Sequence, residues 1–210
     1  MANRLLIFTT FLLFQISYSQ EINIYDENYK FLSKIEYEKV LNISDGKLLD
    51  GNYYVVDSKK NISIKRFIKG IKTGEWLSFH SLFNGLKLVS TVNYSNGKLQ
   101  GYFYRTDNHT YNEEGYYKDG EKHGVWTKKT YSDMNIVEII TYKKGKKDGK
   151  YSLEEIIEGK TKTIKGKYKH NKKCGLWVIK DEYLTIIKED GSEEPSIKKE
   201  YYRNGILIKK

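Results

Sequence analysis

The chain has 210 residues, a formal net charge of +10, one cysteine and one proline. A lone cysteine excludes an intrachain disulfide, so the fold must be stable without covalent cross-links. The only alanine is Ala2, whereas tyrosine occurs 19 times. This composition opposes a helical protein and favours β-strands.

Residues 1–19 differ from the rest of the chain and predict a signal peptide. Arg4 precedes an apolar run at residues 5–14, and Ser17-Tyr18-Ser19 forms a small-x-small cleavage site. The run is short for a membrane span, so we expect cleavage after Ser19 and no transmembrane span in the remainder. An uncleaved anchor is the alternative. Residues 20–210 keep 36 basic and 27 acidic residues, a net charge of +9, and we expect them to be exported (periplasmic, cell-surface or secreted).

Apolar residues alternate between Ile22 and Tyr37, which predicts one or two strands that cap the array described next. From there a single frame recurs to the C-terminus: an aromatic residue, a glycine three positions later, a second glycine four later and an aromatic two later. The copies are Phe67-Gly70-Gly74-Trp76, Tyr94-Gly97-Gly101-Phe103, Tyr117-Gly120-Gly124-Trp126, Tyr142-Gly145-Gly149-Tyr151 and Tyr168-Asn171-Gly175-Trp177, with a looser copy at Ile43-Gly46-Gly51-Tyr53 and a short one at Tyr202-Gly205. Successive second glycines lie 23 to 27 residues apart. A period of this size is typical of a stacked array, so we predict one repeat domain over residues 20–210.

Each frame predicts a β-hairpin. The first glycine follows Asn or Asp in several copies, as in Asn96-Gly97, and such dipeptides form tight turns. With residues 97–100 as the loop, Asn96 faces Gly101 and Tyr94 faces Phe103 across two strands. We expect the second glycine to leave room for an aromatic ring or to permit a bulge.

A second set of turns lies between the frames, at Asn84-Gly85, Glu158-Gly159 and Asp190-Gly191, and in other units at residues 59–61, 107–108 and 133–135. Two turns per unit predict two strands per unit. The expected fold is all-β, an elongated single-layer antiparallel meander of stacked β-hairpins with irregular capping units at both ends. The last unit carries an insertion at residues 189–195, which holds the only proline and indicates a loop or edge.

The Tyr-x-x-Gly-x-x-x-Gly frame with its Gly-x-Trp or Gly-x-Tyr ending resembles the MORN repeat, and more closely the bacterial variant of YwqK-like "toxin–antitoxin system antitoxin" proteins. The resemblance covers Gly46 to Gly205 and is best at residues 67–76, 117–126 and 142–151. Phe103 and Asn171 depart from the pattern. The resemblance implies a twisted sheet of hairpins that contacts proteins or membrane lipids. The antitoxin label implies an intracellular inhibitor of a partner enzyme, which fits poorly with an export signal.

No catalytic signature is present, and we predict neither catalytic residues, nor a cofactor, nor a metal. The four histidines are His80, His109, His123 and His170. His170 and Cys174 are four residues apart, but one such pair falls short of a zinc site. Acidic pairs such as Glu154-Glu155 lie near turns, where solvated charge is the simplest interpretation. We expect the Gly-x-aromatic rings to form the core, although exposed rings could instead form a binding strip.

The positive charge comes almost wholly from lysine, since Arg66, Arg105 and Arg203 are the only arginines after Arg4. Scarce arginine opposes specific nucleic-acid recognition. Lysine runs at residues 143–147 and 169–173 surround turns and are expected to face solvent, either for solubility or for attraction to an anionic surface. The sequence therefore predicts a non-enzymatic binding or scaffolding module of the cell envelope, with a protein or an anionic lipid or glycan surface as partner. The alternative is an antitoxin-like inhibitor.

Overall fold

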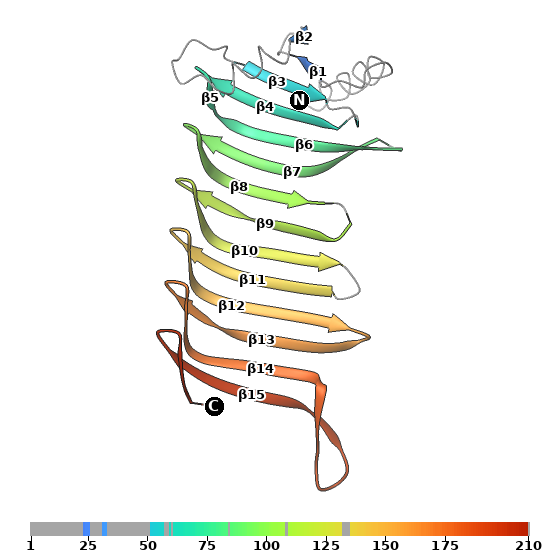
Figure 1. The fold of residues 1–210 in the computed structure, drawn as a ribbon, viewed down its shortest axis with the longest axis vertical. Helices are drawn as coiled ribbons and strands as arrows, with labels where there is room; N and C mark the ends of the chain where they lie inside the picture. Colours follow the sequence, from blue (N-terminus) through green and yellow to red (C-terminus); the bar gives the residue numbers. More distant parts are fainter. Residues whose placement is uncertain are drawn as a thin grey trace. The chain divides into compact units, whose positions relative to one another are not determined.

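The computed structural model describes residues 23–25, 31–32, 51–56, 59, 61–83, 85–107, 109–131 and 135–209. The predicted signal peptide and the loose copy around Gly46 lie outside these residues. Within them the secondary structure is strand and turn, without a helix, and the strands follow one another as consecutive antiparallel hairpins (Figure 1). The predicted all-β hairpin meander is confirmed.

The chain divides into two compact units after Gly97, and each is described by itself. The first contains β1 (Asn23–Tyr25), β2 (Phe31–Leu32), β3 (Gly51–Val56), β4 (Ile62–Ile68), β5 (Ile71–Lys72), β6 (Gly74–Leu82) and β7 (Gly85–Ser95). Its sheet runs β2-β1-β3-β4-β6-β7, and β5 pairs with β4. The short strands β1 and β2 fall where capping strands are predicted.

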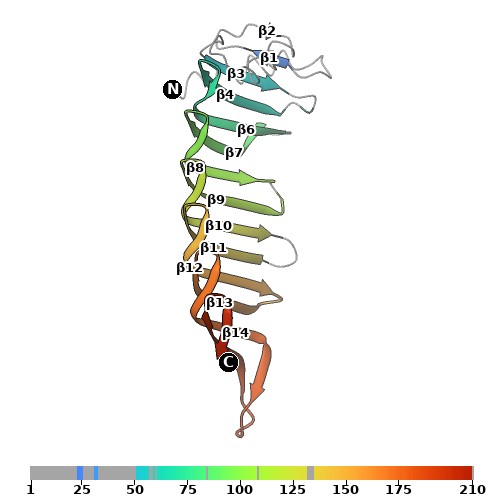
Figure 2. The ribbon, with the colours of Figure 1, turned by 60° about the vertical axis from the view of Figure 1, so that its left-hand side comes forward.

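The second unit contains β8 (Lys98–Thr106), β9 (Tyr111–Lys118), β10 (Glu121–Tyr131), β11 (Asn135–Lys143), β12 (Lys146–Ile157), β13 (Lys160–Lys169), β14 (Lys172–Ile187), β15 (Glu193–Arg203) and β16 (Ile206–Lys209). Every strand pairs antiparallel with the next along the chain. Over the residues that the structure describes, this part of the sheet is open and one layer thick (Figure 2).

The first glycine of each frame, or Asn171 in its place, closes a two-residue turn, and each turn with its flanking residues (117–124, 142–149 and 168–175 in the second unit) is here called a tip. At the tip between β9 and β10, Lys118 pairs with Glu121 across Asp119-Gly120, and both turn residues have positive φ (54° and 87°). Tyr117 therefore faces Lys122 and not Trp126. The four-residue loop predicted for residues 97–100 is wrong as well, since β7 ends at Ser95 and β8 begins at Lys98. An Asn-Gly or Asp-Gly pair closes a hairpin without further residues, because both positions tolerate the left-handed conformation.

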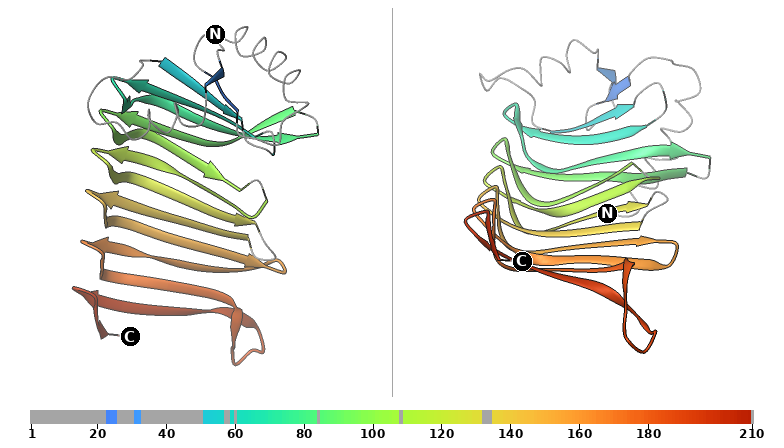
Figure 3. Two further views of the ribbon diagram at one scale, coloured as in Figure 1. Left: turned by 45° about the horizontal axis from the view of Figure 1, so that its top comes forward. Right: turned by 60° about the horizontal axis from the view of Figure 1, so that its bottom comes forward.

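The second glycine begins a bulge that bends its strand. Gly124 has φ +72°, and three residues of β10 (124–126) face the single residue Gly115 of β9. Bulges of this kind increase twist and redirect the strand, and Figure 3 shows the tips turned out of the plane of the sheet. A Cβ added at Gly124 or Gly175 would meet nothing within 4 Å. The bulge expected of the second glycine is confirmed, whereas room for a ring is not its role at these two positions.

Aromatic rings on the side toward which the tips bend form the core. In the second unit Trp126 packs against Phe103, Tyr117 and Tyr142, with ring centroids 5.0–6.2 Å apart. Trp177 repeats this arrangement with Tyr151, Tyr168 and Tyr202. Trp126 and Trp177 are 3% and 1% exposed, so the expectation that these rings form the core is confirmed there. In the first unit Tyr53 and Phe67 are buried in the same way.

The far turns connect the hairpins on the side opposite the tips. Glu158-Gly159 forms a tight turn as predicted, with φ of 49° and 76°. The insertion of the last unit is a projecting ribbon of residues 182–196, here called the arm. Its base is held by the Tyr183 hydroxyl, which donates to the Lys160 carbonyl and accepts from the Ile157 amide, both at 2.8 Å.

Candidate functional site

The repeat-defining residues build the sheet and do not converge on a pocket. Glycines at the frame positions adopt positive φ in turns and bulges, and the second aromatic residues are buried or half-buried. Tyr53, Trp126 and Trp177 are buried, and Trp76, Phe103 and Tyr151 are half-buried. These residues are therefore structural, and a functional site has to be sought on the surfaces that they leave exposed.

Two glycines that the frame does not include accommodate the indole rings. A Cβ added at Gly115 would lie 2.3 Å from Trp126, and one added at Gly166 would lie 2.3 Å from Trp177. Both glycines stand two residues before the tyrosine of the next frame. The sequence carried this signal as Gly115-Tyr116-Tyr117 and Gly166-Lys167-Tyr168, but only these two units show it.

A lysine from each of four tips covers the rings. Because the tips bend over the core, the residue two positions after the turn lies on top of it. The Nζ atom of Lys122 is 3.8 Å from the centroid of Trp126, and that of Lys173 is 4.3 Å from Trp177. Lys72 and Lys147 are placed in the same way over Tyr94 and Tyr168. The expectation that both lysine runs face solvent is thus wrong for Lys147 and Lys173, whose side chains lie over the core rings with the ammonium group above the ring face.

Neighbouring tips are joined by backbone hydrogen bonds. The amide of Gly145 donates to the Lys122 carbonyl (3.0 Å), and the amide of Asn171 donates to the Lys147 carbonyl (2.9 Å). The Asn171 side chain also accepts the Lys147 amide at 2.7 Å. Asn171 has φ +68°, a conformation that asparagine tolerates better than most residues, which explains its place in the frame. The tips of each unit form a fixed row.

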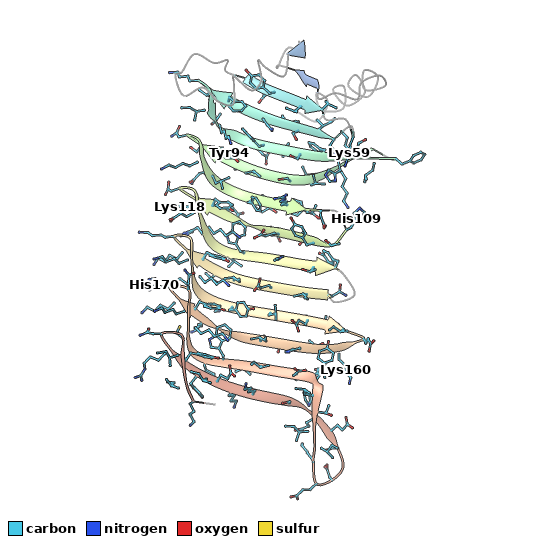
Figure 4. The ribbon with its side chains drawn as sticks, in the orientation of Figure 1. Lys59, Tyr94, His109, Lys118, Lys160 and His170 are labelled. Carbon is cyan, nitrogen blue, oxygen red and sulfur yellow. The ribbon has the colours of Figure 1, made fainter. Side chains whose placement is uncertain are left out.

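The charge on this row changes from one tip to the next. The tip at residues 117–124 exposes Lys118, Asp119 and Glu121, which leave one net negative charge. The next two tips expose Lys143, Lys144 and Lys146, and then Lys169, His170 and Lys172. Figure 4 places Lys118 and His170 on this edge and His109 and Lys160 on the opposite one. A shallow depression of about 320 Å³ between the first two tips is lined by Lys118, Asp119, Glu121, His123, Lys143 and Lys144.

The carboxylates near the rings are paired across strands. Arg105, Glu113, Lys128 and Glu138 stand opposite one another on β8 to β11 with alternating charge. Glu113 accepts from Lys122 at 2.6 Å, and Glu138 accepts from the Tyr151 hydroxyl at 3.2 Å. Such cross-strand pairs stabilise a sheet. Burial, followed by the charge of Glu138, raises the pKa of Tyr151, so this phenol stays protonated as a hydrogen-bond donor.

The candidates for metal or acid–base chemistry do not assemble. His170 lies in a turn with its Nε2 3.5 Å from the Asp148 carboxylate, and Cys174 is half-buried as a free thiol. Across the part of the chain that the structure covers, no group of three His, Cys, Asp or Glu side chains is placed to hold a metal ion. Hydrogen bonds from Thr110 and from the Tyr111 amide lower the pKa of Asp107, which makes it a turn-forming carboxylate.

Exposed apolar residues gather on the arm. Leu184, Ile186 and Ile187 are 63%, 56% and 72% exposed. Acidic residues surround them, at Glu182, Glu189, Asp190, Glu193 and Glu194. This composition contrasts with the basic tips on the other edge of the same sheet.

A search for membrane-spanning helices among the described residues finds none that is long and apolar enough. No protein-family model matches the chain, and no curated protein sequence matches it significantly.

Proposed function

We propose that this protein is an exported, non-enzymatic binding or scaffolding module of the cell envelope, built from MORN-like hairpin repeats of the YwqK-like type. One observation carries the proposal: the sheet is open, and its exposed surface presents a charged row of tips at one edge and an arm with exposed apolar and acidic side chains at the other. The frame aromatic side chains pack within the fold, and the carboxylates near them are engaged by Lys122 or by tyrosine hydroxyls. Such a surface offers area for a partner, and the depression between the tips at residues 117–124 and 142–149 is shallow and open.

The predicted signal peptide favours an envelope location. Residues 1–19 have the charge and hydrophobicity of a signal peptide, and the rings bury themselves without disulfides, so the fold suits an oxidising or a reducing compartment. The partner is a protein or an anionic lipid or glycan surface. The sheet of the second unit carries a lysine excess that favours an acidic partner.

The test combines fractionation with partner capture. The tagged protein should be recovered outside the cytoplasm with a mature N-terminus near Gln20, read by N-terminal sequencing. Immobilised protein should then retain one or more components from solubilised envelopes. Recovery in the cytoplasm with residues 1–19 intact, together with capture of a single intracellular enzyme and loss of that enzyme's activity, would replace this proposal by the antitoxin-like inhibitor.

A further inference from the structure

Five lysines on two adjacent tips form a cationic surface, at whose border Asp119 and Glu121 of the preceding tip share a shallow depression with Lys143 and Lys144. We call Lys143, Lys144, Lys146, Lys169 and Lys172 the lysine patch. All five are exposed, and none forms an ion pair with another residue that the structure describes. The only carboxylate in these tips, Asp148, faces His170 instead.

The fold does not require these charges. Asp119 occupies the turn position of Lys144 one tip earlier, and Glu121 occupies the position of Lys146. Both tips form the same two-residue turn and the same backbone link to the preceding tip. Acidic and basic side chains are thus equally compatible with the hairpin at these positions. The lysines therefore need an explanation other than folding.

The spacing of the patch suits a charged polymer. Successive tips are two strands apart, which is about 10 Å, while the Debye length at physiological ionic strength is about 8 Å. The charges thus repel one another within each tip and partly between tips. A polyanion laid along the row would meet cations on both tips and relieve that repulsion. Tip-to-tip hydrogen bonds at Gly145 and Asn171 hold the two sets of lysines in register for it.

Other anionic partners fit less well. The lysines stand on exposed turns and do not enclose a volume, which a small anion would need. Neither tip exposes a large apolar side chain that could enter a membrane interface. The nearest tyrosines, Tyr142 and Tyr168, lie beneath Lys122 and Lys147 and cannot stack on bases, as single-stranded nucleic acids require. Lysine, unlike arginine, is a point charge on a flexible stem, so it can pair with carboxylates without fixing their orientation.

We propose that the lysine patch is a binding site for a linear anionic polysaccharide, which lies along the row of tips. This inference rests on the proposed envelope function and names the ligand class and the surface that binds it.

The experiment measures binding of alginate and polygalacturonate, as carboxylated polysaccharides, to the purified protein by biolayer interferometry at several salt concentrations. The patch variant carries Lys143→Gln, Lys146→Gln, Lys169→Gln and Lys172→Gln. The matched control carries Lys150→Gln, Lys165→Gln, Lys167→Gln and Lys199→Gln, which removes the same charge from exposed lysines on the face opposite the rings. Neither set touches a turn residue with positive φ, and circular dichroism verifies that both variants are folded.

We expect the patch variant to lose about tenfold or more in affinity and to show a weaker salt dependence, while the control loses much less, because contact with the polyanion is local. Equal losses in both variants would show that only net charge matters and would overturn the assignment. Absence of polysaccharide binding, or tighter binding to duplex DNA or to phosphatidylglycerol vesicles, would also overturn it. If envelope components still bind the patch variant undiminished, the inference fails while the envelope function stands. Cytoplasmic retention of the protein would refute the envelope function by itself.

Discussion

Gly115 lies against the indole of Trp126 without space for a side chain, and this contact gives a prediction with a definite sign. A methyl group at residue 115 would lie 2.3–2.6 Å from three indole carbons, whereas non-bonded carbons prefer about 3.5–4.0 Å. The ring cannot retreat, because Phe103, Tyr117 and Tyr142 surround it. Its Nε1 also donates to the Tyr116 carbonyl at 3.1 Å.

The magnitude follows from two opposing effects. Overpacking of this kind costs about 1–3 kcal/mol. Replacing a glycine that has an ordinary φ by alanine stabilises a protein by about 0.4–1 kcal/mol, because the unfolded chain loses freedom. Taking the middle of both ranges, about 2 less about 0.7 kcal/mol, we expect Gly115→Ala to lower the free energy of unfolding by about 1.3 kcal/mol. Without the ring contact, the same substitution should raise the free energy of unfolding.

The assay is a double-mutant cycle with Trp126→Leu, measured by guanidinium unfolding with far-ultraviolet circular dichroism. Trp126→Leu alone should cost about 2–4 kcal/mol. In that background Gly115→Ala should be neutral or stabilising, which gives a coupling of about 1–3 kcal/mol. The pair Gly166 and Trp177, with the same 2.3 Å approach, should repeat the result. A Gly115→Ala variant that is as stable as the parent, or equal costs in both backgrounds, would refute the packing described here.

Three further predictions concern a turn, the arm and a buried phenol. Gly145 has φ +70°, so Gly145→Asn should be tolerated while Gly145→Val should cost about 1–3 kcal/mol, as thermal unfolding will show; equal effects would contradict the left-handed turn. Tyr183→Phe removes the hydroxyl that holds the Ile157 amide, so hydrogen exchange at that amide should accelerate with little change in global stability. Burial and a hydrogen bond to Glu114 raise the pKa of Tyr102 to about 12. The folded state therefore favours the neutral phenol. The stability that this preference adds is complete below about pH 10 and is lost as pH rises through about 12. Glu114→Gln should lower this pKa in a carbon-13 NMR titration of the tyrosine ring, and an unchanged midpoint would remove Glu114 as a cause.

The turns were predictable from the sequence because their chemistry is local. The turns at Asp119-Gly120 and Glu158-Gly159 need only two residues in the left-handed conformation. A polar residue followed by glycine between two strand-forming segments indicates such a turn directly in the sequence. The period of the frame then gave the hairpin order, since each unit can bury its rings only against its neighbours.

The register within each hairpin could not be read in the same way. Gly124 offered two interpretations, space for a ring or a bulge, and the sequence does not distinguish them. In a hairpin that closes with a two-residue turn, Trp126 would stand opposite Glu113 if the pairing were regular. The bulge moves Trp126 closer to the turn, where it packs against Tyr117. The lysines over the rings were missed for a related reason. Lys122 and Lys147 look like ordinary turn residues until the bend of the tip places them above the core.

The link between tips has a consequence for engineering the chain. The span from the first aromatic residue to the second glycine is eight residues in every full copy, although whole units differ by up to four residues in length. Since each tip amide is bonded to the tip before it, an inserted segment there would break the contact with a neighbour, and all length variation has been absorbed by the far turns. A foreign loop grafted near Asp190-Gly191 should therefore be displayed without disturbing the array, whereas the same graft at Lys144-Gly145 should disconnect one hairpin from the next.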